Sequence, residues 1–165
     1  MFKILFFVSA LCLSQALAFT GSDAIAVLAG FMAAVVQKDD LKEMQTCAKD
    51  ADLLTGDVER IISDVSSLSF SGFFDAIYLA GRVMGEAPFV LRDCETLQED
   101  LATLETQAQI FTHIGELTER ITKNYIWHYT EIMTDISKAN EAATQGNYYS
   151  FGELVGDAVF VALQP

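Results

Sequence analysis

Two groups of side chains have the residue types for metal binding. Asp50 and Asp52, followed by Asp57 and Glu59, suggest a calcium loop at first sight. The EF-hand spacing fails, because the twelfth position needs a carboxylate that chelates calcium and would be Ile61. We therefore interpret these acidic residues as the solvated face of a helix.

The two histidines each precede a glutamate by three residues, as His113-x-x-Glu116 and His128-x-x-Glu131. Di-iron helical bundles use the reverse order, Glu-x-x-His, which does not occur in this sequence. A Gly-x-Ser-x-Gly elbow, a glycine-rich phosphate loop and a His-Glu-x-x-His motif are also missing. We predict no metal site, no cofactor and no enzymatic activity.

The first eighteen residues are typical of a secretory signal peptide. Lys3 is the positively charged part, residues 4–17 are the apolar part, and Ala16-Leu17-Ala18 fits an A-x-A cleavage site. A retained anchor is the less favoured alternative, because a span needs about 20 apolar residues and polar residues interrupt this run. We predict a single mature helical domain, residues 19–165, outside the cell or in the lumen of the secretory or endosomal pathway. After cleavage we expect no transmembrane segment.

The mature chain is strongly acidic. Without Lys3 it has nine basic and 23 acidic residues, a net charge of −14. This charge argues against binding nucleic acid, whose phosphates it would repel, and against docking on anionic lipid by charge. Disorder is not indicated, because 52% of the residues are hydrophobic.

Cys47 and Cys94 are the cysteines left after signal cleavage, and in an oxidising compartment two cysteines most simply pair. Cys94 belongs to the same apolar series as Leu91 and Leu97, and Cys47 follows Met44 by three residues, so both should face the core. We predict a disulfide between them. Two buried thiols or one reactive cysteine are the alternatives.

The element that must organise the chain is an uninterrupted apolar stretch of thirteen residues, Ala24 to Val36. A helix that is apolar on all sides has to be surrounded by other elements. Within it Ala26, Gly30 and Ala34 recur every four residues and form a ridge that allows a neighbouring backbone to approach closely. The stretch is too short to span a membrane, so we interpret it as a buried core helix from about Ser22 to Gln37.

The rest of the sequence has apolar residues at spacings of three and four and no period of two. Helices are indicated over about 40–68 with a weak point at Gly56, and over 72–87, 88–108, 114–136 and 148–163. Pro88 should end one helix or begin the next. We place a chain reversal between Thr106 and Gly115, and one long continuous helix is the alternative. The prediction is an all-α fold, a compact bundle of about five to six helices around a central apolar N-terminal helix.

Two pairs of glycines recur in similar surroundings. Gly81 and Gly85 are repeated, with their apolar neighbours, as Gly152 and Gly156 after 71 residues. A glycine inside a helix costs about 1 kcal/mol relative to alanine, so we expect tight helix packing at all four positions. Duplication and coincidence both remain open as explanations of the repeat.

The C-terminal third contains Asn124, Ile132-x-x-Asp135-Ile136-x-x-Ala139 and Gly146-Asn147-Tyr148-x-x-x-Gly152-x-x-x-Gly156. With an early cysteine, Asp50 soon after it and a second cysteine after a helix pair, the chain resembles a family of small signal-bearing secreted helical proteins of ciliates. That family has no assigned activity, so the resemblance implies the helical architecture and no particular function.

Function must then come from the surface or from a cavity. The primary hypothesis is a secreted acidic helical protein that acts as a non-catalytic binding or structural module of unknown specificity. The alternative is a carrier of a lipid or other apolar small molecule. Several aromatics exceed what one apolar stripe per helix can bury, and they could line a pocket for such a ligand or mark a partner surface. For that case the predicted ligand contacts are Phe31, Phe73, Phe74, Trp127 and Tyr149.

Overall fold

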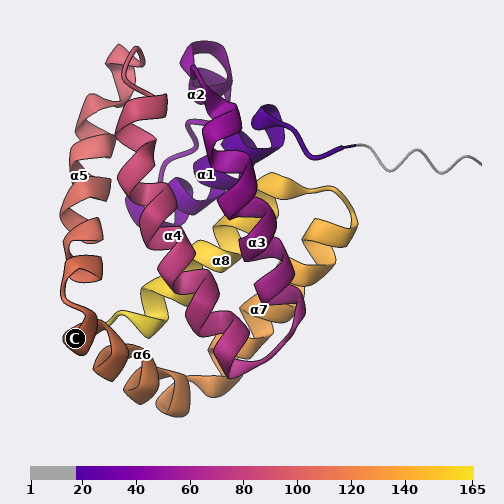
Figure 1. Cartoon of the computed structure of the whole chain (residues 1–165), viewed down its shortest axis with the longest axis vertical. Coiled ribbons are helices and arrows are strands. Elements are labelled where there is room, and N and C mark those ends of the chain that lie inside the picture. Colours follow the sequence, from indigo (N-terminus) through magenta and orange to yellow (C-terminus); the bar gives the residue numbers. More distant parts are fainter. Residues whose placement is uncertain (1–17) are drawn as a thin grey trace, which may run out of the picture.

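We describe the fold from a computed structural model that covers residues 18–165, and the predicted signal peptide lies outside these residues apart from Ala18. All regular structure in this range is helical, which confirms the all-α class (Figure 1). The elements are α1 (Gly21–Val36), α2 (Leu41–Cys47), η1 (Ala51–Leu54), α3 (Thr55–Ser66), α4 (Phe70–Val90), η2 (Glu95–Leu97), α5 (Gln98–Ala108), η3 (Gln109–Thr112), α6 (Ile114–Trp127), α7 (Tyr129–Thr144) and α8 (Tyr148–Ala162).

Residues 18–165 contain eight α-helices, so the predicted number of five to six is wrong. The segment expected as one helix over 40–68 breaks after α2, where Asp50 adopts a left-handed conformation with φ of 55°. The series over 114–136 breaks at His128, whose backbone bends with φ of −111° and ψ of 24°. Pro88 neither ends nor starts a helix, because it lies in the last turn of α4. The expected reversal between Thr106 and Gly115 coincides with the short helix η3.

Helices α1 and α8 pack against each other with their backbones in contact. A Cβ atom on Gly30 would overlap the carbonyl oxygen of Tyr149, and one on Gly152 would overlap the carbonyl oxygen of Val27. On Gly156 it would lie 2.7 Å from the Cβ of Ala34. Only glycine permits this approach, which places the first and last helices of the bundle side by side.

Helix α1 also contacts α2, η1, α3 and α5, but the expectation of a helix enclosed on all sides is not confirmed. Its segment 24–32 is buried except for Ala26, whereas its last turn, 33–36, is only half-buried. The helix begins at Gly21, one residue before the predicted Ser22, because Thr20 caps it and forms a reciprocal capping box with Asp23.

The glycines of α4 differ from those of α8. A Cβ on Gly81 would overlap the ring of Phe111 in η3, so this position is tightly packed against a side chain. Gly85 is exposed, and a Cβ there would meet nothing within 4 Å. The prediction of tight packing at Gly85 is therefore wrong, since this face of α4 has no neighbouring backbone.

Lys38 links the end of α1 to two other elements. Its ammonium group lies 3.1 Å from the carboxylate of Asp40 and 2.7 Å from that of Asp100 in α5. Hydrogen bonds to Asp100 and then to Asp40 raise the pKa of Lys38, whereas burial raises the pKa of Asp40. These two ion pairs attach the turn after α1 to helix α5.

Cys47 and Cys94 form the predicted disulfide, with Cα atoms 5.3 Å apart. It joins the end of α2 to the connection between α4 and η2. The amide of Lys49 donates to the carbonyl of Val90 at 3.0 Å, and Lys49 and Asp93 form an ion pair beside it. Several independent contacts therefore hold the same junction together.

No helix in residues 18–165 has both the length and the apolar character needed to cross a bilayer.

Replacing Cys47 with serine should lower the free energy of unfolding by about 3–5 kcal/mol, because the unfolded chain loses its cross-link and the thiol of Cys94 stays unpaired in the core. Urea denaturation measures the loss, and reduced wild-type protein should lose a similar amount. Thiol titration of the denatured, unreduced mature protein, which lacks Cys12, should find no free thiol; two per chain would contradict the prediction.

Gly30→Ala and Gly152→Ala should each destabilise the fold by about 1–3 kcal/mol or more, because the added methyl groups would force the two backbones apart. Gly85→Ala is the matched control: its methyl group points into open space, and the gain in helix propensity should stabilise by roughly 0.5–1 kcal/mol. Thermal unfolding of the three variants tests this contrast, and equal destabilisation of all three would contradict it.

Candidate functional site

A groove of about 400 Å³ opens where the end of α8 meets η3, α1 and α6. Ligand sites in proteins have volumes of roughly 300–1,000 Å³. Most of its wall is apolar. We call it the Phe111 groove, and it is lined by Phe31, Val35, Met84, Thr106, Gln107, Gln109, Ile110, Phe111, His113, Arg120, Gly156, Val159, Phe160, Leu163, Gln164 and Pro165.

Two walls of the Phe111 groove come from the contact between α1 and α8. Phe31 and Val35 are one turn apart on α1, and Gly156, Val159 and Leu163 follow one another at helical spacing along α8. Because Gly156 lets α8 approach α1 closely, the groove opens at the end of this contact. Figure 1 shows the C-terminal end of the chain beside the η3 connection between α5 and α6.

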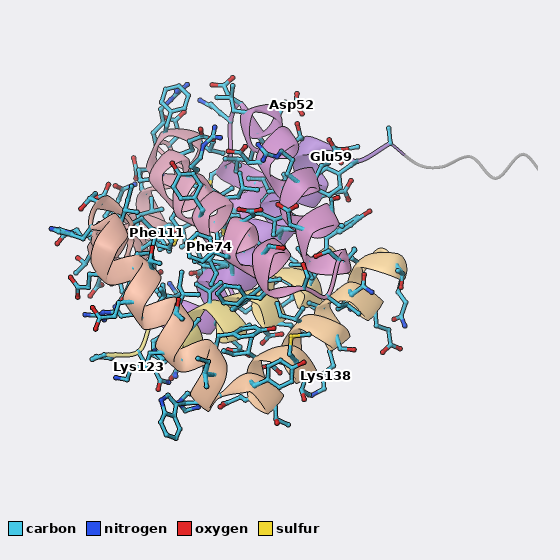
Figure 2. The ribbon with its side chains drawn as sticks, turned by 60° about the horizontal axis from the view of Figure 1, so that its bottom comes forward. Asp52, Glu59, Phe74, Phe111, Lys123 and Lys138 are labelled. Carbon is cyan, nitrogen blue, oxygen red and sulfur yellow. A yellow bond between two sulfur atoms is a disulfide. The ribbon has the colours of Figure 1, made fainter. Side chains whose placement is uncertain are left out.

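Phe111 forms the partition between this groove and a second hollow. The second hollow, of about 370 Å³, lies between α4 and α5 and shares Met84, Gln109 and Phe111 with the first. Its wall also contains Arg82 and Glu105, one side chain of each charge. The ring of Phe111 packs against Gly81 of α4, and Figure 2 shows the residue beside the start of α6. The position of the Phe111 ring, which packs against Gly81, therefore affects the size of the Phe111 groove.

Two polar side chains of α6 hold the chain at the end of α8. Asn124 is 4% exposed and donates to the carbonyls of Ala162 at 3.2 Å and Gln164 at 2.8 Å. Arg120, one turn earlier, donates from Nη1 to the carbonyl of Leu163 at 3.0 Å. Its Nη2 pairs with Glu116. Cationic and donor groups at a helix C-terminus satisfy carbonyls that have no partner within the helix.

Neither of these roles was predicted from the sequence. Asn124 follows Leu117 and Ile121 at helical spacing, and a polar residue in such a buried series indicates a hydrogen-bonding position. The sequence around Arg120 has no spacing that would predict its contact with the end of α8.

The five predicted ligand contacts do not come together. Phe31 lines the Phe111 groove. Phe73 is buried, with its ring centroid 5.8 Å from that of Tyr125, and Phe74 packs near Phe70. Trp127 is 79% exposed at the end of α6, and Tyr149 is half-buried beside Gly30. The structure thus assigns four of the five to places other than the groove.

The side chains considered for metal binding are engaged elsewhere. Asp50 and Asp57 pair with Arg92 and Arg82, at 3.3 and 3.1 Å. The Nδ1 atom of His113 lies 3.0 Å from the Thr112 hydroxyl. The Nδ1 atom of His128 lies 3.3 Å from a carboxylate oxygen of Glu131. Within residues 18–165 no three His, Cys, Asp or Glu side chains group so as to hold a metal ion.

Carboxylates of α7 and α8 lie close together away from the groove. Burial raises the pKa of Asp135, and the negative charge of Asp157 raises it further. Burial and then Glu153 raise the pKa of Asp157. The ion pair with Lys49 has the opposite effect on Asp93, whose pKa is lowered.

As the pH is lowered from neutral towards 3.8, the ordinary pKa of aspartate, protonation of Asp135 and Asp157 should raise the free energy of unfolding. Their folded-state pKa values are raised, so the folded protein binds protons in this range more tightly than the unfolded chain. Asp157→Asn should reduce this gain in stability. Asp93 has a lowered pKa, so its contribution to stability is present above 3.8 and is lost as the pH falls below that value; Asp93→Asn should therefore reduce the loss of stability in the more acidic range. Urea denaturation gives the free energy of unfolding of each variant against pH, and the same change in both variants would contradict the assignment.

Comparison of the chain with protein-family models, with curated proteins and with solved structures finds no match in any of the three. The resemblance to secreted helical proteins of ciliates therefore stays a prediction.

Proposed function

We propose that this chain is a non-catalytic binding protein, and that its ligand is a lipid or another apolar small molecule held in the Phe111 groove. The observation that carries the proposal is the wall of the groove, in which apolar side chains from α1, α4, η3 and α8 surround a volume of about 400 Å³. Apolar surface of this kind gains free energy when a ligand removes it from water.

A binding role is favoured over catalysis by the polar groups in the wall. Ser, Cys, Asp and Glu side chains do not line the groove. His113 directs Nδ1 to the hydroxyl of Thr112 and to the carbonyl of Gln109, both within its own turn. The wall thus offers no nucleophile paired with an activating base.

We also propose that the protein acts outside the cell or in the lumen of the secretory or endosomal pathway. Support comes from the signal-like first eighteen residues and from the pairing of Cys47 with Cys94, since disulfides persist in oxidising compartments. The suspected relationship to secreted ciliate proteins agrees with this location.

A second candidate function is a module that binds a protein or has a structural role. The observation in its favour is the bend between α6 and α7, where Ile126, Trp127 and Tyr129 are 69%, 79% and 53% exposed. Exposed aromatics near one another are common at protein interfaces.

Native mass spectrometry of gently purified mature protein separates the two candidates. The carrier proposal expects a bound apolar molecule, and a rise in melting temperature when lipid is added back to the delipidated protein. A dimer whose mass contains no bound small molecule would support the interface candidate instead. Protein that carries no apolar molecule in the spectra, and whose melting temperature does not change when lipid is added, would overturn the carrier proposal.

Gly81→Ala should weaken the binding of a neutral apolar probe such as dodecanol roughly tenfold, because its methyl group pushes the ring of Phe111 away from α4 and into the groove. Gly85→Ala, one turn later on α4, lies outside the groove wall and meets nothing within 4 Å. Titration calorimetry should give this control variant the wild-type affinity. Equal dodecanol affinities of wild type, Gly81→Ala and Gly85→Ala would show that the probe binds elsewhere.

A further inference from the structure

We infer that the ligand of the Phe111 groove is a single-chain amphiphile with a carboxylate head group, a free fatty acid, with its head beside Arg120 and its tail along the apolar wall. This inference rests on the proposed function, since it names the chemical class of the ligand at the same site. It starts from the distribution of charge around the groove.

The ionisable side chains in the groove wall are Arg120 and His113. The chain has 23 acidic residues and only 10 Lys and Arg, yet no acidic side chain lines this groove. The second hollow, by contrast, contains Glu105. Among the side chains of this wall the only permanent charge is the cation of Arg120, which complements a ligand that is apolar along most of its length and anionic at one end.

Arg120 lies where such a head group would have to bind. Its side chain is 30% exposed, and Nη1 donates to the carbonyl of Leu163, which itself lines the groove. That hydrogen bond holds the guanidinium at the end of the apolar wall. A guanidinium has five N–H donors, and here Nη1 and Nη2 make the hydrogen bonds within residues 18–165. Donors remain for a carboxylate, and hydrogen bonds between ionised partners are about twice as strong as neutral ones.

Glu116 makes the negative charge of the head group testable. Its own carboxylate already pairs with Nη2 of Arg120, from a side chain that is 49% exposed and outside the groove wall. A ligand carboxylate would share Arg120 with Glu116 or displace it, because two anions near one cation repel each other. Removal of the charge on Glu116 should therefore strengthen the binding of an anionic ligand and leave a neutral one unaffected.

The test compares dodecanoate with dodecanol, whose tails match and whose head groups differ in charge. Both are titrated below micelle-forming concentrations into delipidated wild-type protein and into Arg120→Gln, Arg120→Lys and Glu116→Gln. Wild-type protein should bind dodecanoate roughly tenfold or more tightly than dodecanol. Arg120→Gln should remove this preference and Arg120→Lys should keep much of it. Glu116→Gln should increase the preference and keep the wild-type affinity for dodecanol, because Glu116 lies outside the groove wall.

Two outcomes would overturn the inference: equal affinities for the two probes in wild-type protein, or a preference for dodecanoate that persists undiminished in Arg120→Gln. The first would still leave the proposed function intact, whereas failure to bind either probe would refute that function itself. Arg120→Gln also removes a contact to the end of α8, so its melting temperature without ligand is compared with wild type. Should it fail to fold, the wild-type comparison and Glu116→Gln decide the question.

Discussion

The direct contact between the backbones of α1 and α8 is the constraint on which the rest of the structure depends. Gly30 and Gly152 place one helix against the carbonyl oxygens of the other, at a separation that any side chain would prevent. The contact joins two strongly apolar helices, and α7 and α6 pack against α8 whereas α2, α3 and α5 pack against α1. It also aligns Phe31 with Val159, which gives the Phe111 groove two of its walls.

A second set of contacts completes the groove at its polar end. Helix α6 reaches the end of α8 through Asn124 and Arg120, which bind three successive carbonyl groups at residues 162–164. These interactions satisfy a helix terminus, and they also place a cation at the edge of an apolar surface. The same residue can thus stabilise the fold and define which head group the groove accepts.

The sequence predicted those features that depend on local pattern. The helical class, the buried stretch from Ala24, and the disulfide all follow from spacing and residue type. The break at His128 was missed, because no proline or glycine marks it and tertiary packing bends the chain there. Gly85 appeared equivalent to Gly156, but a helix sequence does not reveal whether another backbone lies opposite. The groove escaped prediction for a similar reason, since its wall combines residues from five α-helices and η3.

The partnership of the first and last helices has a consequence for biosynthesis. Helix α1 ends at residue 36 and α8 begins at residue 148, so a ribosome must add more than a hundred residues before the two can meet. At a synthesis rate of about 5–20 residues per second this takes roughly ten seconds. For that time the most apolar segment of the emerging chain lacks its partner, and it is exposed to aggregation or to capture by chaperones. The contact between α1 and α8 therefore forms only after α8 has been synthesised.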